Sequence, residues 1–294
     1  MSNAPVLVTT QAPVGRARIQ LLEVCRTHPP VTIAAALVLL LFLVALLAPF
    51  ISPYDPIAVN ANAAYLPPLS PGHLLGSDEL GRDLFSRMLW GARVSLPVAF
   101  VAVAVGLVGG GLIGLVSGYA GGISDLVLMR LIDALLAFPG LILAIAIVAA
   151  LGPGLRNAMI AIGIVAIPVY ARLVRALVLQ LKQMEFVAAT RSLGATPLRL
   201  IVHHLIPNLL NPIIVQISLS AGFAILAEAT LSFLGLGAQV PTPDWGQMIN
   251  SGSTFLDNDA WLAIVPGAAI SVTVYAFNLL GDSLRDALDP RLRS

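Results

Sequence analysis

The sequence predicts an all-α integral membrane protein with about six transmembrane helices, and three observations lead to this fold class. Of the 294 residues, 58% are hydrophobic and only 11% are charged, whereas an ordinary soluble domain carries roughly 25% charged residues. The apolar residues gather into runs long enough to cross a hydrocarbon layer of about 30 Å. The net charge is only +1, and the basic residues are scattered among short connections rather than gathered on one face. Both observations argue against a nucleic-acid-binding surface.

Six runs have the length and composition of a membrane-spanning helix. Their approximate limits are 31–51, 94–117, 123–151, 158–179, 212–236 and 261–280. The third run carries Asp125, Arg130 and Asp133 near its start and a Phe-Pro-Gly triplet at 138–140. We therefore expect it to begin as an interfacial helix and to bend at Pro139. The first run is too long for the apolar part of a signal peptide, so we predict an uncleaved span.

The distribution of Lys and Arg over the connections predicts the orientation of the chain. With both termini in the cytoplasm, twelve basic residues lie on the inner side and four on the outer side. The predicted organisation is a cytoplasmic segment at 1–30, a first span at 31–51, an outer connection at 52–93, a five-helix core at 94–283 with a cytoplasmic loop at 180–211, and a cytoplasmic tail at 284–294. The single cysteine, Cys25, precedes the first span and excludes an intramolecular disulfide.

The outer connection is expected to form a proline-rich excursion followed by a helix on the outer surface of the membrane. Five prolines lie between residues 53 and 71, and proline disfavours regular hydrogen-bonded structure. From Asp83 to Trp90 the apolar side chains share one helical face, and Trp90 has the position of an interfacial anchor. The alternative is that Asp78, Glu79 or Asp83 contacts a substrate directly.

The second run has a glycine at every fourth position, namely Gly106, Gly110, Gly114 and Gly118. This spacing removes the side chains from one helical face, so that another helix can approach it closely. We predict helix packing for this face. A dinucleotide site is excluded, because no strand precedes the glycines and no acidic ribose partner follows them.

Glu228 is the ionisable residue of the fifth run. A carboxylate at that depth costs several kcal/mol unless it is neutral, paired or hydrated. It lies roughly eight residues, or about 12 Å, from the predicted outer end of the helix. A place in the translocation path or its gate is the leading interpretation, and a buried structural hydrogen bond or a proton carrier are the alternatives. The connection at 237–260 has acidic but no basic residues. This composition fits a lid over the outer end of the pathway, and it fits equally well a connection that merely lies on the outer side.

The stretch 182–211, called the elbow here, has the pattern of two short helices joined by a tight turn. Gly194 is expected to close the first helix in a left-handed conformation, and Thr196 with Pro197 to start the second. An apolar stripe follows at Leu198, Ile201, Val202 and Leu205. Pro207 is expected to end or bend the second helix. We expect the elbow to face the cytoplasm and to be too small for a core of its own; a plain connection is the alternative.

The elbow resembles the EAA loop that marks the membrane subunits of bacterial ABC importers. Ala189, Gly194 and Pro207 have the spacing of that pattern, in which a proline follows the glycine by thirteen residues. Ala188 and Thr190 depart from it, since the pattern has a glutamate and a second alanine there. Three residues before Ala188, the chain has the glutamate that is typical of the peptide-permease version of the loop.

Three further stretches resemble the second permease subunit of dipeptide, oligopeptide, glutathione and nickel importers. They are HLLGSDELGRDLFSR at 73–87, AEATLSFLGLGAQVPTPDWG at 227–246 and AFNLLGDSLRDALDPRLR at 276–293. Ser77 replaces the usual threonine of the first stretch. The resemblance runs from about residue 30 to the end of the chain and does not specify the substrate.

The resemblance implies a pore-forming permease subunit of a bacterial cytoplasmic membrane that imports small peptides. Its partners would be membrane lipid, a homologous permease subunit, two ATPase subunits and an extracytoplasmic binding protein. The elbow would be the coupling helix that docks on an ATPase, through Glu185, Ala189, Arg191, Gly194 and Pro207. ATP and Mg²⁺ would bind to the ATPase partners, and this chain would hold no cofactor or metal. A nickel-complex importer is the alternative within the family.

The residues themselves also indicate a transport subunit rather than an enzyme. The only lysine, Lys182, follows a leucine, so the chain has no GxxxxGK[ST] phosphate loop. No combination of nucleophile, base and orienting acid indicates catalysis. The adjacent His203 and His204 point in different directions on a helix and cannot share a metal. An ion-driven transporter that uses Glu228 stays open as a second class of function, although no inverted repeat is detectable.

Overall fold

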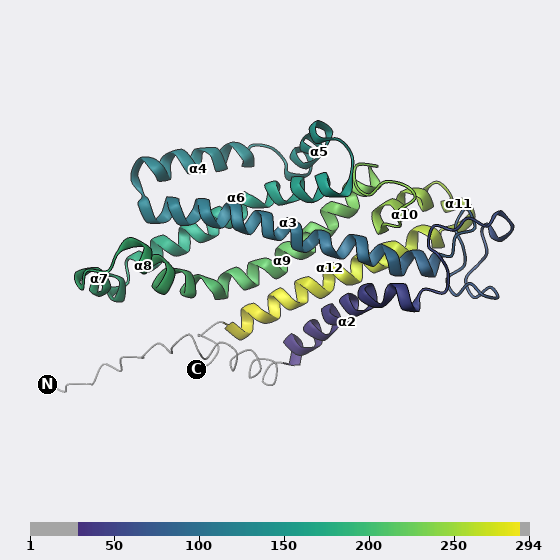
Figure 1. Cartoon of the computed structure of the whole chain (residues 1–294), viewed down its shortest axis with the longest axis horizontal. Coiled ribbons are helices and arrows are strands. Elements are labelled where there is room, and N and C mark those ends of the chain that lie inside the picture. Colours follow the sequence, from purple (N-terminus) through teal and green to yellow (C-terminus); the bar gives the residue numbers. More distant parts are fainter. Residues whose placement is uncertain (1–28, 289–294) are drawn as a thin grey trace.

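The computed structural model describes residues 29–288, and in this part of the chain every regular element is a helix (Figure 1). The predicted all-α class is confirmed. Five helices are long and apolar enough to cross a membrane, and one bent pair adds a sixth candidate span. They are α2 (Pro29–Ile51), α3 (Leu84–Ala120), the pair α4 (Gly122–Leu136) and α5 (Gly140–Leu151), α6 (Leu155–Lys182), α9 (Ile206–Phe233) and α12 (Trp261–Leu288). Cys25, most of the predicted segment 1–30 and residues 289–294 lie outside the described residues.

The long helices lie side by side and give the bundle two distinct ends (Figure 1). The elbow end carries α7 (Glu185–Ser192) and α8 (Pro197–Leu200). The loop end carries the connection 52–83, α10 (Trp245–Ser253) and α11 (Leu256–Asp259). The start of α2 packs against the end of α12, where Val31 meets Ala287. The first and last described helices therefore have their outermost residues on the same side of the bundle.

Helices α3 and α6 pack backbone against backbone, because the glycine face of α3 is turned to α6. A methyl group at Gly110 would lie 2.8 Å from Cβ of Tyr170 and 2.9 Å from the backbone nitrogen of Ala171. A methyl group at Gly106, Gly114 or Gly118 would also lie in close contact with atoms of α6. Small residues at this spacing allow an approach that any side chain would prevent.

Helices α4 and α5 meet at an angle of 90°. The break precedes α5 at Pro139, which has no N–H to continue the hydrogen bonding of a helix, so the predicted bend is confirmed. Two ion pairs hold α4 along α6. The carboxylate of Asp125 accepts hydrogen bonds from Nε and Nη2 of Arg175, each at 2.6 Å. The carboxylate of Asp133 accepts one from Nη2 of Arg172 at 2.7 Å.

The helix predicted from Asp83 to Trp90 is present, and these residues form the start of the longer helix α3. Asp83 is the N-cap of α3, and its Oδ2 accepts hydrogen bonds from the backbone nitrogen and the hydroxyl of Ser86, both at 2.7 Å. The helix then continues to Ala120. Leu84 and Leu89, which the sequence placed against lipid, are buried inside the protein. Tertiary packing thus replaces the membrane surface as their apolar environment.

The close contact between α3 and α6 predicts different effects for two neighbouring glycines. Gly110→Ala should lower the free energy of unfolding by about 1–3 kcal/mol, because the new methyl group overpacks the backbone of α6. Gly111→Ala is the matched control, since its methyl group would reach only Leu107, at 3.9 Å. There alanine should be neutral or slightly stabilising, by up to ~1 kcal/mol. Thermal denaturation of the purified variants measures the difference, and equal midpoints would contradict the packing role.

Candidate functional site

The first helix of the elbow ends as the sequence predicts. Gly194 has φ +80°, which is the left-handed region. Its backbone nitrogen donates to the carbonyl of Arg191 at 2.9 Å, and the nitrogen of Ala195 donates to the carbonyl of Thr190 at 3.3 Å. These bonds satisfy carbonyl groups that the end of α7 leaves free, so the helix can end here and α8 can begin at Pro197.

The second helix of the elbow also begins as predicted, but it does not end at Pro207. Thr196 Oγ1 accepts from the backbone nitrogen of Arg199 at 3.4 Å, and Pro197 follows the cap. After α8, a π-helical turn (Ile201–Leu205) leads directly into α9. The extra residue of the π turn comes just before Pro207, whose missing N–H is accommodated in the first turn of α9. The elbow is therefore continuous with a candidate span.

The elbow shares a small hydrophobic core with the helices next to it, which agrees with the expectation that it is too short for a core of its own. Val187, Leu200 and Leu205 are buried together with Val178 of α6 and Leu209 of α9. The last turns of α6 supply the side chains that the elbow itself lacks. The elbow is thus held firmly on the two helices that it joins.

Other apolar side chains of the elbow point away from this core. Leu193 is 88% exposed and Leu198 is 71% exposed, and Val202 is exposed as well. The predicted stripe is therefore divided, because only Leu205 is buried. The predicted coupling residues Glu185, Ala189, Arg191 and Gly194 are exposed as well, and Pro207 is half-buried. An exposed apolar surface with charged neighbours at the end of a bundle is typical of a protein contact.

At the loop end, the acidic residues weighed as substrate contacts are used in structural bonds. The Oδ2 atom of Asp78 receives Nε of Arg82 at 2.6 Å and Nε of Arg87 at 3.3 Å. Its Oδ1 accepts from two backbone nitrogens, and Arg82 also pairs with Glu79 at 3.1 Å. Asp83 caps α3 and receives Nδ1 of His73 at 2.8 Å. Asp78 and Asp83 are buried, which leaves their carboxylates no free face for a substrate.

The connection 52–83 is folded rather than extended, although it is rich in proline. The hydroxyl of Ser77 donates to the carbonyl of Ala63 and accepts from the backbone nitrogen of Leu66. The guanidinium of Arg87 reaches back to the carbonyl of Pro56 at 3.0 Å. Buried polar side chains thus supply the hydrogen bonds that the prolines cannot make. The density of Ser, Asp and Arg at 77–87 was the available sequence signal for this network.

Glu228 is fully buried between α9 and α10. Its Oε1 accepts from the hydroxyl of Ser232 at 2.7 Å, and its carboxyl group interacts with that of Asp244. Asp244 is itself buried and caps α10 by accepting from the backbone nitrogen of Gln247 at 3.0 Å. Ser95 of α3 also lies next to the Glu228 carboxyl group. The contact between the buried side chains of Glu228 and Asp244 joins α9 to the N-cap of α10.

The segment 237–260 includes a helix that is part of the bundle. In α10, Nε1 of Trp245 donates to the carbonyl of Met88 in α3 at 3.1 Å. A methyl group at Gly246 would lie 2.7 Å from Cα of Ala229 in α9. Asn250 Nδ2 donates to the carbonyl of Phe233 at 2.7 Å, near the end of α9. Helix α10 therefore joins α3 to α9 at the loop end.

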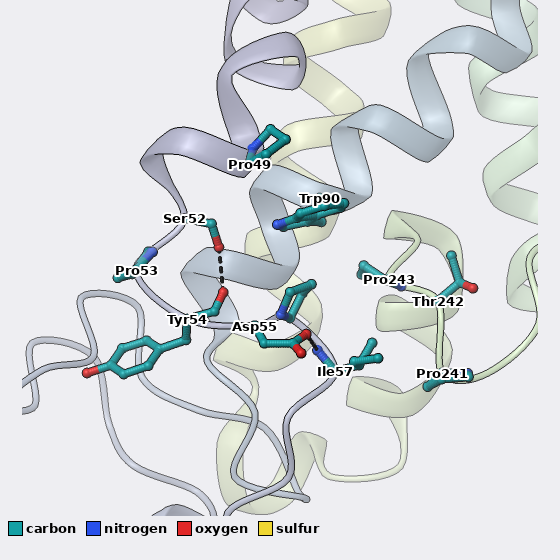
Figure 2. Close-up of a pocket in the computed structure, with 11 residues that line it drawn as sticks. Pro49, Ser52, Pro53, Tyr54, Asp55, Ile57, Trp90, Pro241, Thr242 and Pro243 are labelled. Carbon is teal, nitrogen blue, oxygen red and sulfur yellow. Dashed lines mark hydrogen bonds between the residues drawn. The ribbon is translucent and has the colours of Figure 1, made fainter.

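An open groove of about 660 Å³ lies at the loop end between the end of α2, the start of α3 and the segment before α10 (Figure 2). Its walls are Pro49, Ser52, Pro53, Tyr54, Asp55, Pro56, Ile57, Trp90, Pro241, Thr242 and Pro243. Asp55 accepts from the backbone nitrogen of Ile57 at 3.0 Å, and Arg93 lies over the ring of Trp90 at 4.9 Å. The sequence analysis missed this groove, although its proline clusters are visible at 53–56 and 241–243.

The described part of the chain contains no group of three or more His, Cys, Asp or Glu side chains that could hold a metal ion. His203 is exposed, and His204 lies against the ring of Phe186 with the ring centroids 6.4 Å apart. The groove and the elbow offer protein contacts and packing surfaces rather than reactive groups.

The ion-pair network predicts a large effect at Asp78. Asp78→Ala should lower the free energy of unfolding by about 3–5 kcal/mol, because it leaves Arg82 and Arg87 buried without their carboxylate. Asp55→Ala is the matched control in the same connection, since Asp55 is exposed and should cost less than ~1 kcal/mol. Thermal denaturation and protease resistance of the connection 52–83 measure both variants. An Asp78→Ala variant as stable as Asp55→Ala would contradict the role of the network.

Comparison with known proteins gives two family matches. The model for the binding-protein-dependent transport system inner membrane component matches residues 110–294. The model for the N-terminal TM domain of oligopeptide transport permease C matches residues 24–68.

Curated relatives cover most of the chain. The dipeptide transport system permease protein DppC of Alkalihalophilus pseudofirmus is 46% identical over 252 residues, which are 86% of this chain and 83% of the relative. The glutathione transport system permease protein GsiD of Pectobacterium atrosepticum is 45% identical over 265 residues, which are 90% of this chain and 88% of the relative.

A solved structure of the MetNI methionine ABC transporter in an inward-facing conformation matches the fold. Its TM-score is 0.58 at 19% identity, over 70% of this chain and 98% of that chain. The ion-driven transporter considered from the sequence is wrong, because the family is a binding-protein-dependent one. The chain belongs to the family of binding-protein-dependent transport system inner membrane components, as a multi-pass permease of the type found in peptide and glutathione ABC importers, and not as an enzyme.

Proposed function

We propose that this chain is the pore-forming half of an ATP-driven importer of small peptides across the bacterial cytoplasmic membrane. The observation that carries this proposal is that the relatives of this chain are named for substrates of one chemical class. They are permeases for dipeptides, D,D-dipeptides, di- and tripeptides, and glutathione, at 44–47% identity. All of these substrates are short peptides or peptide-like. A nickel complex is the alternative within the family, and these relatives favour peptides over it.

In this proposal the elbow end faces the cytoplasm and the loop end faces outward. The twelve-to-four distribution of basic residues supports this orientation, as does the position of the start of α2 and the end of α12 on one side of the bundle. The segments 1–30 and 284–294 are then cytoplasmic. The connection that the sequence placed at 52–93 is outer, with its last residues inside α3. The remaining helices between 94 and 283 form the permease core.

The elbow is the coupling helix of the proposed importer. Its exposed surface, with Leu193 and Leu198 beside Arg191, fits a groove on an ATPase subunit. Its small core transmits a force on that surface to α6 and α9, because Val187 and Leu205 belong to one buried cluster with residues of both helices. Within the predicted coupling set, Glu185, Ala189, Arg191 and Gly194 belong to this surface, while Pro207 supports the start of α9.

The partners follow from this arrangement. ATP and Mg²⁺ bind to two ATPase subunits, and a binding protein delivers peptides to the loop end. A homologous second permease completes the pore. Exposed apolar side chains on α4, on α5 and in the break between them, among them Leu131, Ile142 and Phe138, face lipid or this second permease.

Glu228 belongs to the outer gate of the proposed pathway. Its contact with Asp244 holds α10 against α9, beside the glycine contact at Ala229. Opening the outer end would have to separate or shift this pair. As a gate element, Glu228 acts through its shape and its hydrogen bonds.

Reconstitution of the complete complex in lipid vesicles tests the substrate class. We expect uptake of a labelled dipeptide that requires ATP, the binding protein and both permeases. A nickel chelate offered in the same assay should not be taken up. Uptake of the chelate without uptake of dipeptides or glutathione would replace the peptide proposal by the nickel alternative.

The turn at Gly194 predicts the first effect on coupling. Gly194→Val should abolish most of the ATP hydrolysis that the loaded binding protein stimulates, because a β-branched residue at φ +80° is strained by about 1–3 kcal/mol. Gly194→Asn is the control, since asparagine tolerates this conformation and no atom lies within 4 Å of a new Cβ. Membrane insertion, followed by immunoblot, should be normal for both. Unchanged hydrolysis in the valine variant would contradict the coupling role of the elbow.

Two substitutions at Glu228 separate the gate from a proton carrier. Glu228→Gln should keep assembly and ATP-dependent uptake, because the amide retains the shape and can donate a hydrogen bond to Asp244. Glu228→Ala should lower the free energy of unfolding by about 2–5 kcal/mol, because it leaves a cavity and removes the partner of a buried carboxyl group. Thermal denaturation and vesicle uptake measure both. Loss of uptake in a fully assembled glutamine variant would instead support the proton carrier.

A further inference from the structure

We propose that Tyr119 is a positioning residue for energy coupling, which links the elbow to the last turn of α3. Movement of the elbow would then reach α3 as well as α6 and α9. The inference rests on the proposed coupling role of the elbow, and it adds a residue outside the predicted coupling set.

The first observation is the bond between the ends of α3 and α6. Lys182, the last residue of α6, donates from Nζ to the carbonyl of Gly118 at 3.1 Å and to the carbonyl of Tyr119 at 2.8 Å. These carbonyls belong to the last turn of α3, where no further helical N–H reaches them and the helix dipole favours a cation. The only lysine of the chain is therefore placed where it holds Tyr119 next to the start of the elbow.

The second observation is the position of the Tyr119 ring. Nζ of Lys182 lies 5.6 Å from its centroid, and Cζ of Arg191 lies 5.9 Å from it. Both distances are within the reach of a cation–π interaction. Lys182 ends α6 and Arg191 belongs to α7, so one aromatic ring of α3 contacts the helices on both sides of the first bend of the elbow.

The surroundings of Tyr119 make it a firm point of contact. Its side chain packs on the core of the elbow, as that of Phe186 does. In the helix that follows α3, Asp125 of α4 accepts from the hydroxyl of Ser117 in α3 and from Arg175 in α6. The helices α3, α4 and α6 are thus bonded together next to Tyr119. A displacement of its ring is passed to this unit rather than absorbed by a loose side chain.

Helix α3 also has the length to carry a displacement to the other end of the bundle. It runs over 37 residues, which is about 55 Å at 1.5 Å per residue. Near its other end, the ring of Trp245 packs against Gly91, and Trp245 donates to the carbonyl of Met88. Through α3, the elbow is therefore in mechanical contact with α10 and the proposed outer gate.

The test uses the complete complex, with partner permease, ATPases and binding protein, reconstituted in vesicles. Tyr119→Leu should lower the number of dipeptides taken up per ATP hydrolysed by about two- to fivefold, the order of effect of an exposed cation–π contact. Assembly and basal ATP hydrolysis should be unchanged. Tyr119→Phe should keep the wild-type ratio, because the aromatic face remains. Tyr275→Leu is the matched control, since Tyr275 is an exposed aromatic residue on α12.

A wild-type ratio in Tyr119→Leu would overturn the inference, and so would an equal loss in Tyr119→Leu and Tyr119→Phe. If Tyr119→Leu does not assemble, Lys182→Met provides a second variant that keeps the ring. It should lower the number of dipeptides taken up per ATP hydrolysed. A wild-type number in that variant would overturn the inference as well. Gly194→Val separates the two proposals. If it uncouples the complex while the Tyr119 variants do not, only the inference about Tyr119 fails, whereas unchanged coupling in Gly194→Val removes the role of the whole elbow.

Discussion

The structure depends on the contact between the backbones of α3 and α6. Glycines spaced by four residues bring α3 so close to α6 that even one methyl group at Gly110 would overlap it. The two helices therefore behave as one unit. The ion pairs of Asp125 and Asp133 fasten α4 to the same unit. Dispersion between closely packed helices is the attraction that remains where lipid cancels the hydrophobic effect, so this contact is where the permease gains its rigidity.

The two ends of this unit are built in different ways that suit their proposed tasks. The loop end is stiffened by buried charge, because Asp78 binds two arginines and Asp83 fixes the first turn of α3. The elbow end is held by a small apolar core and leaves Leu193 and Leu198 on the surface. A network of buried ion pairs tolerates little change, since removing one member strands the others. An exposed apolar surface on a firm support is instead ready to bind another protein.

Acidic residues in the interior have structural partners in this fold. Glu228 bonds Ser232 and faces Asp244, and Asp244 also caps α10. Helix α10 in turn contacts α3 through Trp245. The gate proposed at the outer end is therefore a set of helix contacts rather than a ring of charges. Such a gate suits a permease that receives its substrate from a binding protein, because selection among substrates can take place before the pore.

The sequence by itself determined the features that depend on short-range chemistry. The apolar runs, the bend at Pro139, the left-handed turn at Gly194 and the cap at Thr196 each follow from a few neighbouring residues, and the motif spacing led to the correct family. Only the tertiary structure decided the rest. It buried Leu84 inside the protein, gave the elbow a core from α6 and α9, and brought Asp244 to Glu228 and Trp245 to Met88. These outcomes depend on which surfaces meet, and residues as far apart as 88 and 245 carry no local signal of the contact that they make.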